Sequence, residues 1–308
     1  MNQQNNTQQR QFDSCSDHIV RATACGNAMR AFACRTSDTC REAVRLHDLS
    51  PVAAAAIGRL MSGVLMLGCD LDQPGDTITA LVQGDGPLQN ITVVGEENAT
   101  VRGTVRQPHV ETRYLKSGKL DVGSALGKGT LTIIKDMRLK EPYIGRVALV
   151  SGEIAEDIAA YLSISEQIPS IVSLGVKMDR GGITHAGGLM VQLLPNAGED
   201  IVSWLEERVC HLPDVTAMIE DGATPAAMRA RLLGEENMTI HEQVPCSYAC
   251  PCNRERMVKN LLAMGRKELG ELAQDPHGIS LECHFCDRHY HFSQTEIRQV
   301  LGDNPHVE

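Results

Sequence analysis

Two closely spaced cysteine pairs near the end of the chain constrain its fold more than any other feature. Cys250 and Cys252 form a C-x-C pair, and Cys283 and Cys286 form a C-x-x-C pair, with thirty residues between the two pairs. Four sulfurs are the number that a tetrahedral zinc ion needs to close its coordination shell. Structural zinc ribbons more often use C-x-x-C twice, and thiols as close as those of C-x-C can also oxidise to a tight disulfide. We therefore predict a zinc–thiolate redox switch that acts on the rest of the chain.

Rival ligands lie beside both pairs. Cys246 is four residues before Cys250 and can replace it, while His284, His289 and His291 can bind zinc through an imidazole nitrogen. We prefer the four paired cysteines, because two thiolates at each end give one compact site without remodelling either loop. The choice between Cys246 and Cys250 stays open at this point.

Composition excludes several classes of protein. The 308 residues carry a formal net charge of −10, which argues against a nucleic-acid binder held by phosphate contacts. The eleven cysteines are an odd number in a long chain, and the first residues have no apolar signal-peptide core. These features predict a reducing compartment, the cytoplasm. The longest apolar run, 51–69, approaches the length of a membrane span, but it contains Arg59 and many Ala and Gly residues. We expect a buried helix there and no membrane partner.

Most of the chain is predicted to form an α+β domain over 12–195, preceded by a disordered Gln/Asn-rich segment at 1–11. The segment 12–49 has a mixed pattern with scattered cysteines. Short β-branched runs with tight connections then predict one antiparallel sheet, and a later pair of runs predicts a closing hairpin. A helix over 152–165 starts with Glu153, Glu156 and Asp157, which we interpret as charges that favour the helix dipole rather than as a catalytic cluster. The expected strands are 76–83, 90–94, 99–105, 129–134, 143–150, 171–178 and 188–194.

Two smaller regions complete the chain. Apolar residues at helical spacing, interrupted by Pro and Gly, predict short helices over a linker at 196–240, and such helices must pack on something to be stable. The region 241–308 is expected to form a small C-terminal domain in which Asn253 caps a helix, 279–282 is a strand, and Ser293 with Glu296 forms a capping box. A unit of this size is helped by a metal staple.

Several motifs resemble those of the bacterial redox-regulated 33 kDa chaperonin (heat-shock holdase) family, and the resemblance covers the chain from about residue 12. The shared motifs are QGDGP at 83–87, SEQIPS at 165–170, AGGLMVQ at 186–192, CPCNRER at 250–256 and CHFCD at 283–287. The combination of C-x-C and C-x-x-C in this order, after a sheet domain, is specific. The resemblance implies an N-terminal α/β domain, a helical linker and a C-terminal zinc domain.

The resemblance also implies an ATP-independent chaperone rather than an enzyme. Cys250, Cys252, Cys283 and Cys286 would hold one Zn²⁺ per chain when reduced, and the disulfides Cys250–Cys252 and Cys283–Cys286 would form under oxidative stress. The family further implies unfolded client proteins as partners and a homodimer when the protein is oxidised. We hypothesise that loss of the metal module releases the linker and exposes apolar side chains to clients, namely those of Trp204, Leu205, Leu212, Met218 and Ile219.

Two other functions compete with this interpretation. Basic residues on the helical insert of the C-terminal region motivate a zinc-ribbon module that binds RNA or a transcription partner, although the net charge favours a solvated helix face. A thiol–disulfide oxidoreductase would need C-x-x-C at the start of a helix in a βαβ setting, whereas Cys283 and Cys286 are expected to join two strands.

Overall fold

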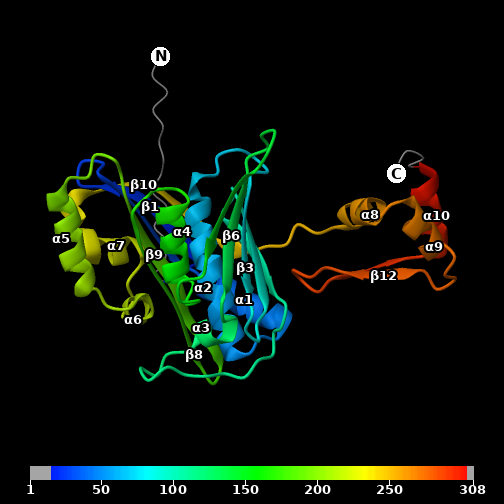
Figure 1. Ribbon diagram of the computed structural model, residues 1–308, viewed down its shortest axis with the longest axis horizontal. Helices are drawn as coiled ribbons and strands as arrows, with labels where there is room; N and C mark the ends of the chain where they lie inside the picture. Colours follow the sequence, from blue (N-terminus) through cyan, green and yellow to red (C-terminus); the bar gives the residue numbers. More distant parts are fainter. Residues whose placement is uncertain (1–14, 304–308) are drawn as a thin grey trace, which may run out of the picture. The chain divides into compact units, whose positions relative to one another are not determined.

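The computed structural model describes residues 15–303 and divides the chain into two compact units, 1–249 and 250–308 (Figure 1). The predicted disordered segment at 1–11 lies outside the described residues. Antiparallel sheets with packed helices make up the first unit, and a two-stranded sheet with three helices makes up the second. The predicted α+β fold class is confirmed. The predicted boundaries at 195 and 240 stay predictions, and a strand at Met238–Pro245 crosses the second of them.

The first sheet of the larger unit has five antiparallel strands in the order β10-β1-β2-β9-β8. In register, β1 pairs His18 with Arg35 of β2 on one side and with Pro245 of β10 on the other. The predicted closing hairpin is the β8–β9 pair of this sheet. The strands are β10 (Met238–Pro245), β1 (His18–Ala24), β2 (Met29–Arg35), β9 (Gly182–Leu193) and β8 (Ser170–Asp179).

The second sheet has six strands in the order β11-β5-β4-β3-β6-β7, and it contains the five runs predicted between residues 76 and 150. All its neighbours are antiparallel except β11, which runs parallel to β5. The turn after β3 requires glycine, because a Cβ at Gly84 would lie 2.0 Å from the carbonyl oxygen of Leu126. The strands are β11 (Ser247–Tyr248), β5 (Thr100–Val105), β4 (Asn90–Glu96), β3 (Thr77–Gly84), β6 (Gly129–Asp136) and β7 (Tyr143–Ala148).

Helix α2 (Pro51–Leu67) lies between the two sheets and forms the centre of the core (Figure 1). Together with the turn after it, the helix is long and apolar enough to cross a membrane, but 16 of its 17 residues are buried inside the unit. The predicted buried helix is confirmed. The other helices packed in this unit's core region are α1 (Ser37–His47), η1 (Gly68–Asp70), α3 (Val122–Leu126) and α4 (Ala155–Ile164).

Two of the acidic residues at the start of α4 do more than favour the helix dipole. Asp157 is 1 % exposed, and its carboxylate accepts hydrogen bonds from four backbone N–H groups of the preceding turn. Glu153 forms an ion pair with Arg59 of α2. Glu156 alone is exposed to solvent. These carboxylates therefore fix the turn from which α4 begins.

Three helices cover the outer face of the first sheet, the face opposite α2 (Figure 1). We call them the helical layer: α5 (Glu199–Cys210), α6 (Val215–Glu220) and α7 (Pro225–Leu233). They confirm the prediction of short helices in this region. The sheet face beneath them combines the small side chains of Ala24, Ala31 and Ala33 with larger apolar ones, among them those of Met29, Leu189 and Val191. A short 3₁₀ turn, η2 (Glu235–Asn237), then leads into β10.

The described part of the smaller unit, residues 250–303, has its own apolar cluster of eight buried residues. Asn253 caps α8 by accepting from the N–H of Arg256, and Ser293 with Glu296 forms the predicted capping box at the start of α10. The elements are α8 (Arg254–Ala263), α9 (Arg266–Leu272), β12 (Ile279–Glu282), β13 (His289–Phe292) and α10 (Gln294–Asp303).

Candidate metal centre

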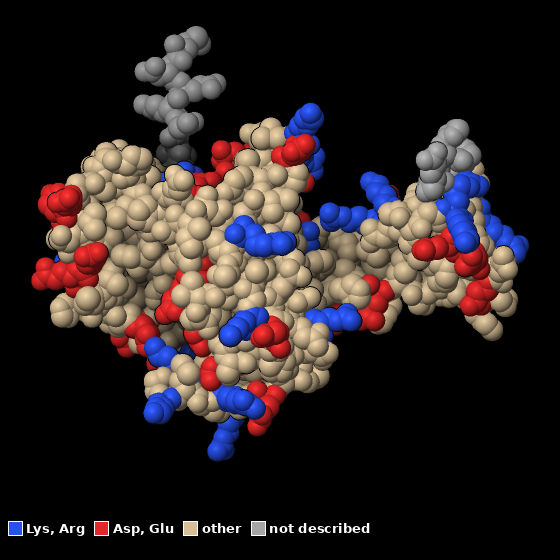
Figure 2. Space-filling view, in the orientation of Figure 1, with Lys and Arg blue, Asp and Glu red and all other residues tan. Residues whose placement is uncertain are grey.

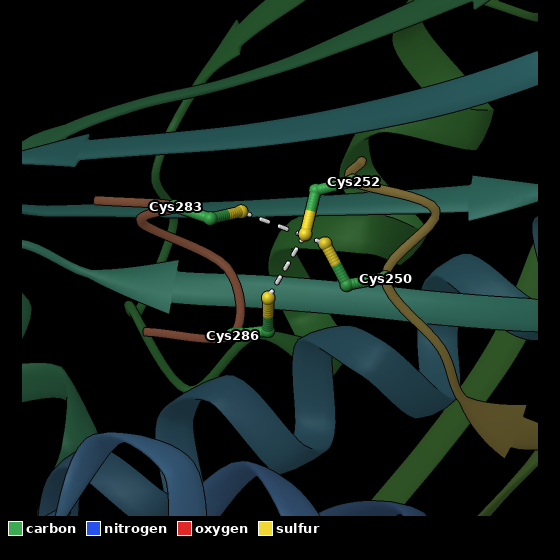
Figure 3. A group of neighbouring side chains, drawn as sticks. All are labelled: Cys250, Cys252, Cys283 and Cys286. Atoms are coloured by element: carbon green, nitrogen blue, oxygen red, sulfur yellow. Dashed lines mark hydrogen bonds between the residues drawn. The ribbon is translucent and has the colours of Figure 1, made fainter. Parts of the chain in front are cut away.

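The four paired cysteines converge on one point of the smaller unit (Figure 3). All four sulfurs lie within 4.8 Å of one another. The sulfurs of Cys250 and Cys283 are 3.6 Å apart, and those of Cys252 and Cys286 are 3.2 Å apart. The structure therefore brings together the predicted ligand set.

Local structure explains how the first pair is presented. Cys250 and Cys252 lie in the extended segment that leads into α8, and the cap at Asn253 fixes where the helix begins. Met257 and Leu261 on the next turns of α8 are buried in the small core together with Cys252. The helix thus anchors the loop that carries both sulfurs.

A tight turn between β12 and β13 presents the second pair. The carbonyl of Cys283 accepts from the N–H groups of Cys286 and Asp287, at 3.1 and 2.8 Å. Asp287 has a φ of 54°, in the left-handed region that such a turn needs and that Asp adopts more readily than most residues. The N–H of Cys283 closes the turn by donating to the carbonyl of Arg288. This arrangement confirms that the C-x-x-C pair joins two strands. A thiol–disulfide oxidoreductase would instead carry the pair at the start of a helix.

Without a bound metal, the surroundings of the thiols shift their pKa values in different directions. Burial raises the pKa of Cys250, and it raises that of Cys286 to about 11. Burial acts in the same direction on Cys252, but hydrogen bonds from the Tyr290 hydroxyl and from neighbouring thiols outweigh it and lower the pKa of Cys252 to about 7. The hydroxyl of Tyr290 donates to the Cys252 sulfur at 3.1 Å. Tyr290 was not predicted from the sequence, because its role depends on a hydrogen bond between residues 38 positions apart.

The rival ligands lie apart from the four-sulfur group. Cys246 is buried in the core of the larger unit, where its sulfur donates to the carbonyl of Arg35 at 3.5 Å. His284, His289 and His291 are exposed and are not part of the group. A compact set of four thiols at the ends of two well-anchored loops fits a thiophilic cation such as Zn²⁺ in a closed structural site. The four cysteines could therefore hold one metal ion.

The basic side of α8 and α9 is less available than its composition indicates. Arg254 forms an ion pair with Glu296, and its guanidinium lies over the ring of Phe292, 4.2 Å from the centroid. Arg266 donates to the carbonyl of Leu301. In the view of Figure 2, basic and acidic side chains are mixed on the surface of this unit. These contacts engage two basic residues of the insert, while Arg256, Lys259 and Lys267 are exposed.

The hypothetical client-binding residues lie in the helical layer, except for Leu212, which lies in the connection between α5 and α6. Leu205, Met218 and Ile219 are at most 2 % exposed and pack against the first sheet. Trp204 and Leu212 are partly buried and line a shallow surface pocket, where Arg208 stacks 5.1 Å from the Trp204 ring centroid. Such an apolar face would become accessible to a partner only after the layer leaves the sheet.

Comparisons with known proteins agree with this architecture. The family model described as Hsp33 protein matches residues 17–293. A 33 kDa chaperonin of Ruminiclostridium cellulolyticum is 44 % identical over 94 % of this chain and 99 % of its own, and one of Desulforamulus reducens is 42 % identical over 92 % and 97 %. The crystal structure of the 33 kDa chaperonin (heat shock protein 33 homologue) of Thermotoga maritima superposes with a TM-score of 0.85 at 33 % identity, covering 94 % of this chain and 99 % of the other. The chain therefore belongs to the Hsp33 family of 33 kDa chaperonins.

Proposed function

We propose that this protein is a redox-regulated, ATP-independent holdase chaperone of the cytoplasm, and not an enzyme. It would bind unfolding proteins under oxidative and heat stress and prevent their aggregation. The observation that carries the proposal is the convergence of four thiols in a unit whose own core is small, in a chain whose apolar sheet face is covered by short helices. The names of the curated relatives support the chaperone class.

In the reduced state, Cys250, Cys252, Cys283 and Cys286 would hold one Zn²⁺ per chain. A bound zinc ion supplies a closed tetrahedral cross-link and, in small modules, about 10–16 kcal/mol of apparent binding free energy that acts as folding free energy. The cross-link would join the loop before α8 to the β12–β13 turn. Because the small core contains only eight buried residues, two of them cysteines, the unit would depend on this link.

Oxidation would remove the ligands. Two thiols lose two electrons and two protons to hydrogen peroxide, one S–S bond forms, and the peroxide leaves as two water molecules. We propose the pairs Cys250–Cys252 and Cys283–Cys286, which the family resemblance implies. The reduced geometry alone does not select them, because all four sulfurs lie within 4.8 Å of one another and close approaches also run between the pairs. Peptide mapping of the oxidised protein decides between the two pairings.

Unfolding of the smaller unit would then loosen the helical layer and expose its buried face. The chain leads directly from α7 through β10 and β11 to Cys250, so the thiols are continuous with the segment that completes the larger unit. Trp204, Leu205, Leu212, Met218 and Ile219 would contact clients, and the oxidised protein would form a homodimer. We expect neither nucleic acid nor a membrane as a partner, and a test for salt-dependent RNA binding by the reduced protein checks the first of these.

The test uses the full-length reduced, zinc-loaded protein treated with hydrogen peroxide at raised temperature. A chromogenic chelator follows zinc release, circular dichroism follows helix content, and light scattering follows the aggregation of a heat-unfolded client. We expect one zinc per chain to be released, together with helix loss and suppressed aggregation. A Cys283→Ser/Cys286→Ser variant should lose oxidant-dependent suppression, whereas a Cys15→Ser/Cys210→Ser control, which removes two exposed thiols, should keep it.

Two outcomes would contradict the proposal. Oxidant-dependent suppression that survives in Cys283→Ser/Cys286→Ser would place the sensor elsewhere. Zinc that stays bound, or that leaves without structural change, would indicate a purely structural ribbon, and a zinc-ribbon binding module would become the better hypothesis.

A further inference from the structure

The helical layer contains a fully buried cation. Arg229 of α7 is 0 % exposed, and its neighbours Met228, Leu232 and Leu233 are buried against the first sheet. Among residues 15–303, which the structure describes, none of its three guanidinium nitrogens has a hydrogen-bond partner. Arg229 therefore occupies a position on the apolar face of its helix without the contacts that normally accompany a buried charge.

The other buried arginines of the described chain are each paired. Arg59 lies against Glu153, Arg102 against Glu96, and Arg35 has the Asp17 carboxylate 3.7 Å from its Nε. All three are slightly more exposed than Arg229, at 8–9 %. Each of these three arginines thus has a carboxylate partner, whereas no ion pair or hydrogen bond to the Arg229 side chain is found among the described residues.

An unpaired buried charge opposes the packed state. Water solvates a guanidinium strongly, and an apolar environment without hydrogen bonds cannot replace that solvation. Burial lowers the pKa of Arg229 to about 10 for this reason, so the group remains charged at neutral pH. Docking of α7 on the sheet therefore carries a desolvation penalty that disappears when the helix leaves.

Apolar contacts of the layer offset this penalty, because Met228, Leu232 and Leu233 of α7 are buried in one cluster with apolar side chains of the sheet. The sheet face also includes Ala31 and Ala33, whose small side chains contribute less apolar area than larger ones would. Two ion pairs connect the ends of α6 to the rest of the larger unit, but all four side chains are about half exposed. The pairs are Lys119–Asp214 and Lys177–Glu220. Exposed pairs contribute little to stability.

We propose that Arg229 is a built-in weak point that keeps the helical layer close to release. Its charge favours the undocked layer, in which the guanidinium is solvated, over the docked one. The docked layer is then less stable than it would be with an apolar residue at this position. This inference rests on the proposed function in one respect: the released surface is the one proposed to bind clients.

The test compares two single substitutions on the same helix. Arg229→Met removes the buried charge and keeps an unbranched apolar side chain, while Arg231→Met removes an exposed charge two residues away. Hydrogen exchange of the α7 amides is measured on the reduced, zinc-loaded full-length protein. We expect exchange in Arg229→Met to slow by about tenfold or more, the effect typical of replacing unfavourable buried charges by apolar groups. Exchange in Arg231→Met should stay close to that of the unsubstituted protein.

A third variant separates charge from packing. Arg229→Lys keeps the positive charge on a shorter side chain, so its α7 amides should exchange as fast as in the unsubstituted protein, or faster. Slow exchange in Arg229→Lys would show that packing, not charge, controls the layer. Exchange in Arg229→Met that is unchanged or faster would overturn the inference as well.

Activation by peroxide distinguishes this inference from the proposed function. If both hold, Arg229→Met suppresses client aggregation only after longer oxidation than the unsubstituted protein needs. If exchange slows in Arg229→Met but neither protein gains suppression after oxidation, the inference stands and the proposed function fails. If the unsubstituted protein is activated but the exchange rates of the two are equal, the proposed function stands and the inference fails.

Discussion

The two units of the chain use the same residue type in opposite ways. In the larger unit, Cys34, Cys40 and Cys246 are buried in a core built around α2, and burial raises the pKa of each thiol. In the smaller unit, four thiols face one another at one point. A thiol kept protonated is inert, whereas clustered thiols bind metal or oxidise. Reactivity is therefore determined by what surrounds each cysteine rather than by the cysteine count.

The units also differ in what stabilises them. The larger unit surrounds a 17-residue helix with two sheets, while the smaller one has eight buried residues in its core. The first is expected to be stable through apolar burial and hydrogen bonds, and the second through a cross-link between its loops.

Removal of bound metal should have the largest effect. In the zinc-loaded protein, a strong chelator under reducing conditions should unfold the smaller unit, because about 10–16 kcal/mol of metal-binding free energy is lost. Hydrogen exchange resolved by segment should show loss of protection in α8–α10 and retained protection in α2 and β3. Protection that persists in α8 after complete metal removal would mean that the small core suffices, and the contrast between the units would disappear.

Substitution of Asp157 should produce the largest single-residue effect in the larger unit. Asp157→Ala leaves four buried or partly buried N–H groups without their acceptor, so we expect a loss of about 3 kcal/mol in the free energy of unfolding. Urea unfolding of the larger unit measures this loss. Glu156→Ala, which changes an exposed neighbour, should alter the stability by less than about 0.5 kcal/mol. Equal effects of the two substitutions would show that the carboxylate serves only the helix dipole.

The buried thiols should make the larger unit less stable at alkaline pH. Burial raises the pKa of Cys40 from 9.0 to about 12, so the folded state keeps a proton that the unfolded state loses above pH 9. The free energy of unfolding therefore falls as the pH rises from about 9 to 12, by about 1.4 kcal/mol per pH unit for each such thiol. Cys40→Ala should flatten this slope by that amount in urea unfolding at pH 9.5 and 10.5, with Cys210→Ala as the exposed control. An unchanged slope would contradict the assignment.

Tyr290→Phe should have the smallest effect of these changes. It tests whether a single hydrogen bond controls the reactivity of one thiol in the smaller unit. The substitution removes the hydroxyl that donates to the Cys252 sulfur, which leaves the sulfur more nucleophilic. We expect peroxide to release zinc about fivefold faster, the factor that corresponds to a hydrogen bond worth about 1 kcal/mol. Stopped-flow detection with a chromogenic chelator measures the rate, and His289→Phe, on the same strand, is a suitable control. A rate that does not change would mean that the hydroxyl does not tune this thiol.

The sequence predicted elements whose signals are local. The strands from β3 to β9, the buried helix α2, the caps at Asn253 and Ser293 and the convergence of the cysteine pairs all follow from periodicity, spacing or turn chemistry. Strand β2 was missed because six of its seven residues are buried, so apolar and polar residues do not alternate along it. Strand β1 was also missed, although its half-buried Arg21 and Thr23 alternate with buried residues. Strand β10 was missed for the opposite reason: it is a largely exposed edge whose pairing with β1 is non-local.

Tyr290 and Arg229 also show that contacts between residues far apart in the sequence limit what the sequence predicts. Tyr290 depends on a contact that no spacing rule predicts. Arg229 could have been found, because Leu232 and Leu233 come after it at helical spacing and place it on the apolar side of α7. What the sequence could not show is that its guanidinium makes no hydrogen bond to any described residue.

The segment before Cys250 has a consequence for fragment design. Strand β10 closes the first sheet along β1, and β11 closes the second along β5. A fragment truncated after Leu233 would leave an open edge on both sheets, and unpaired edges promote self-association through strand addition. A fragment truncated after Ala249 keeps both edges covered. The residues from Met238 to Tyr248 therefore act as edge protection for the larger unit, whether or not the smaller unit is attached to them.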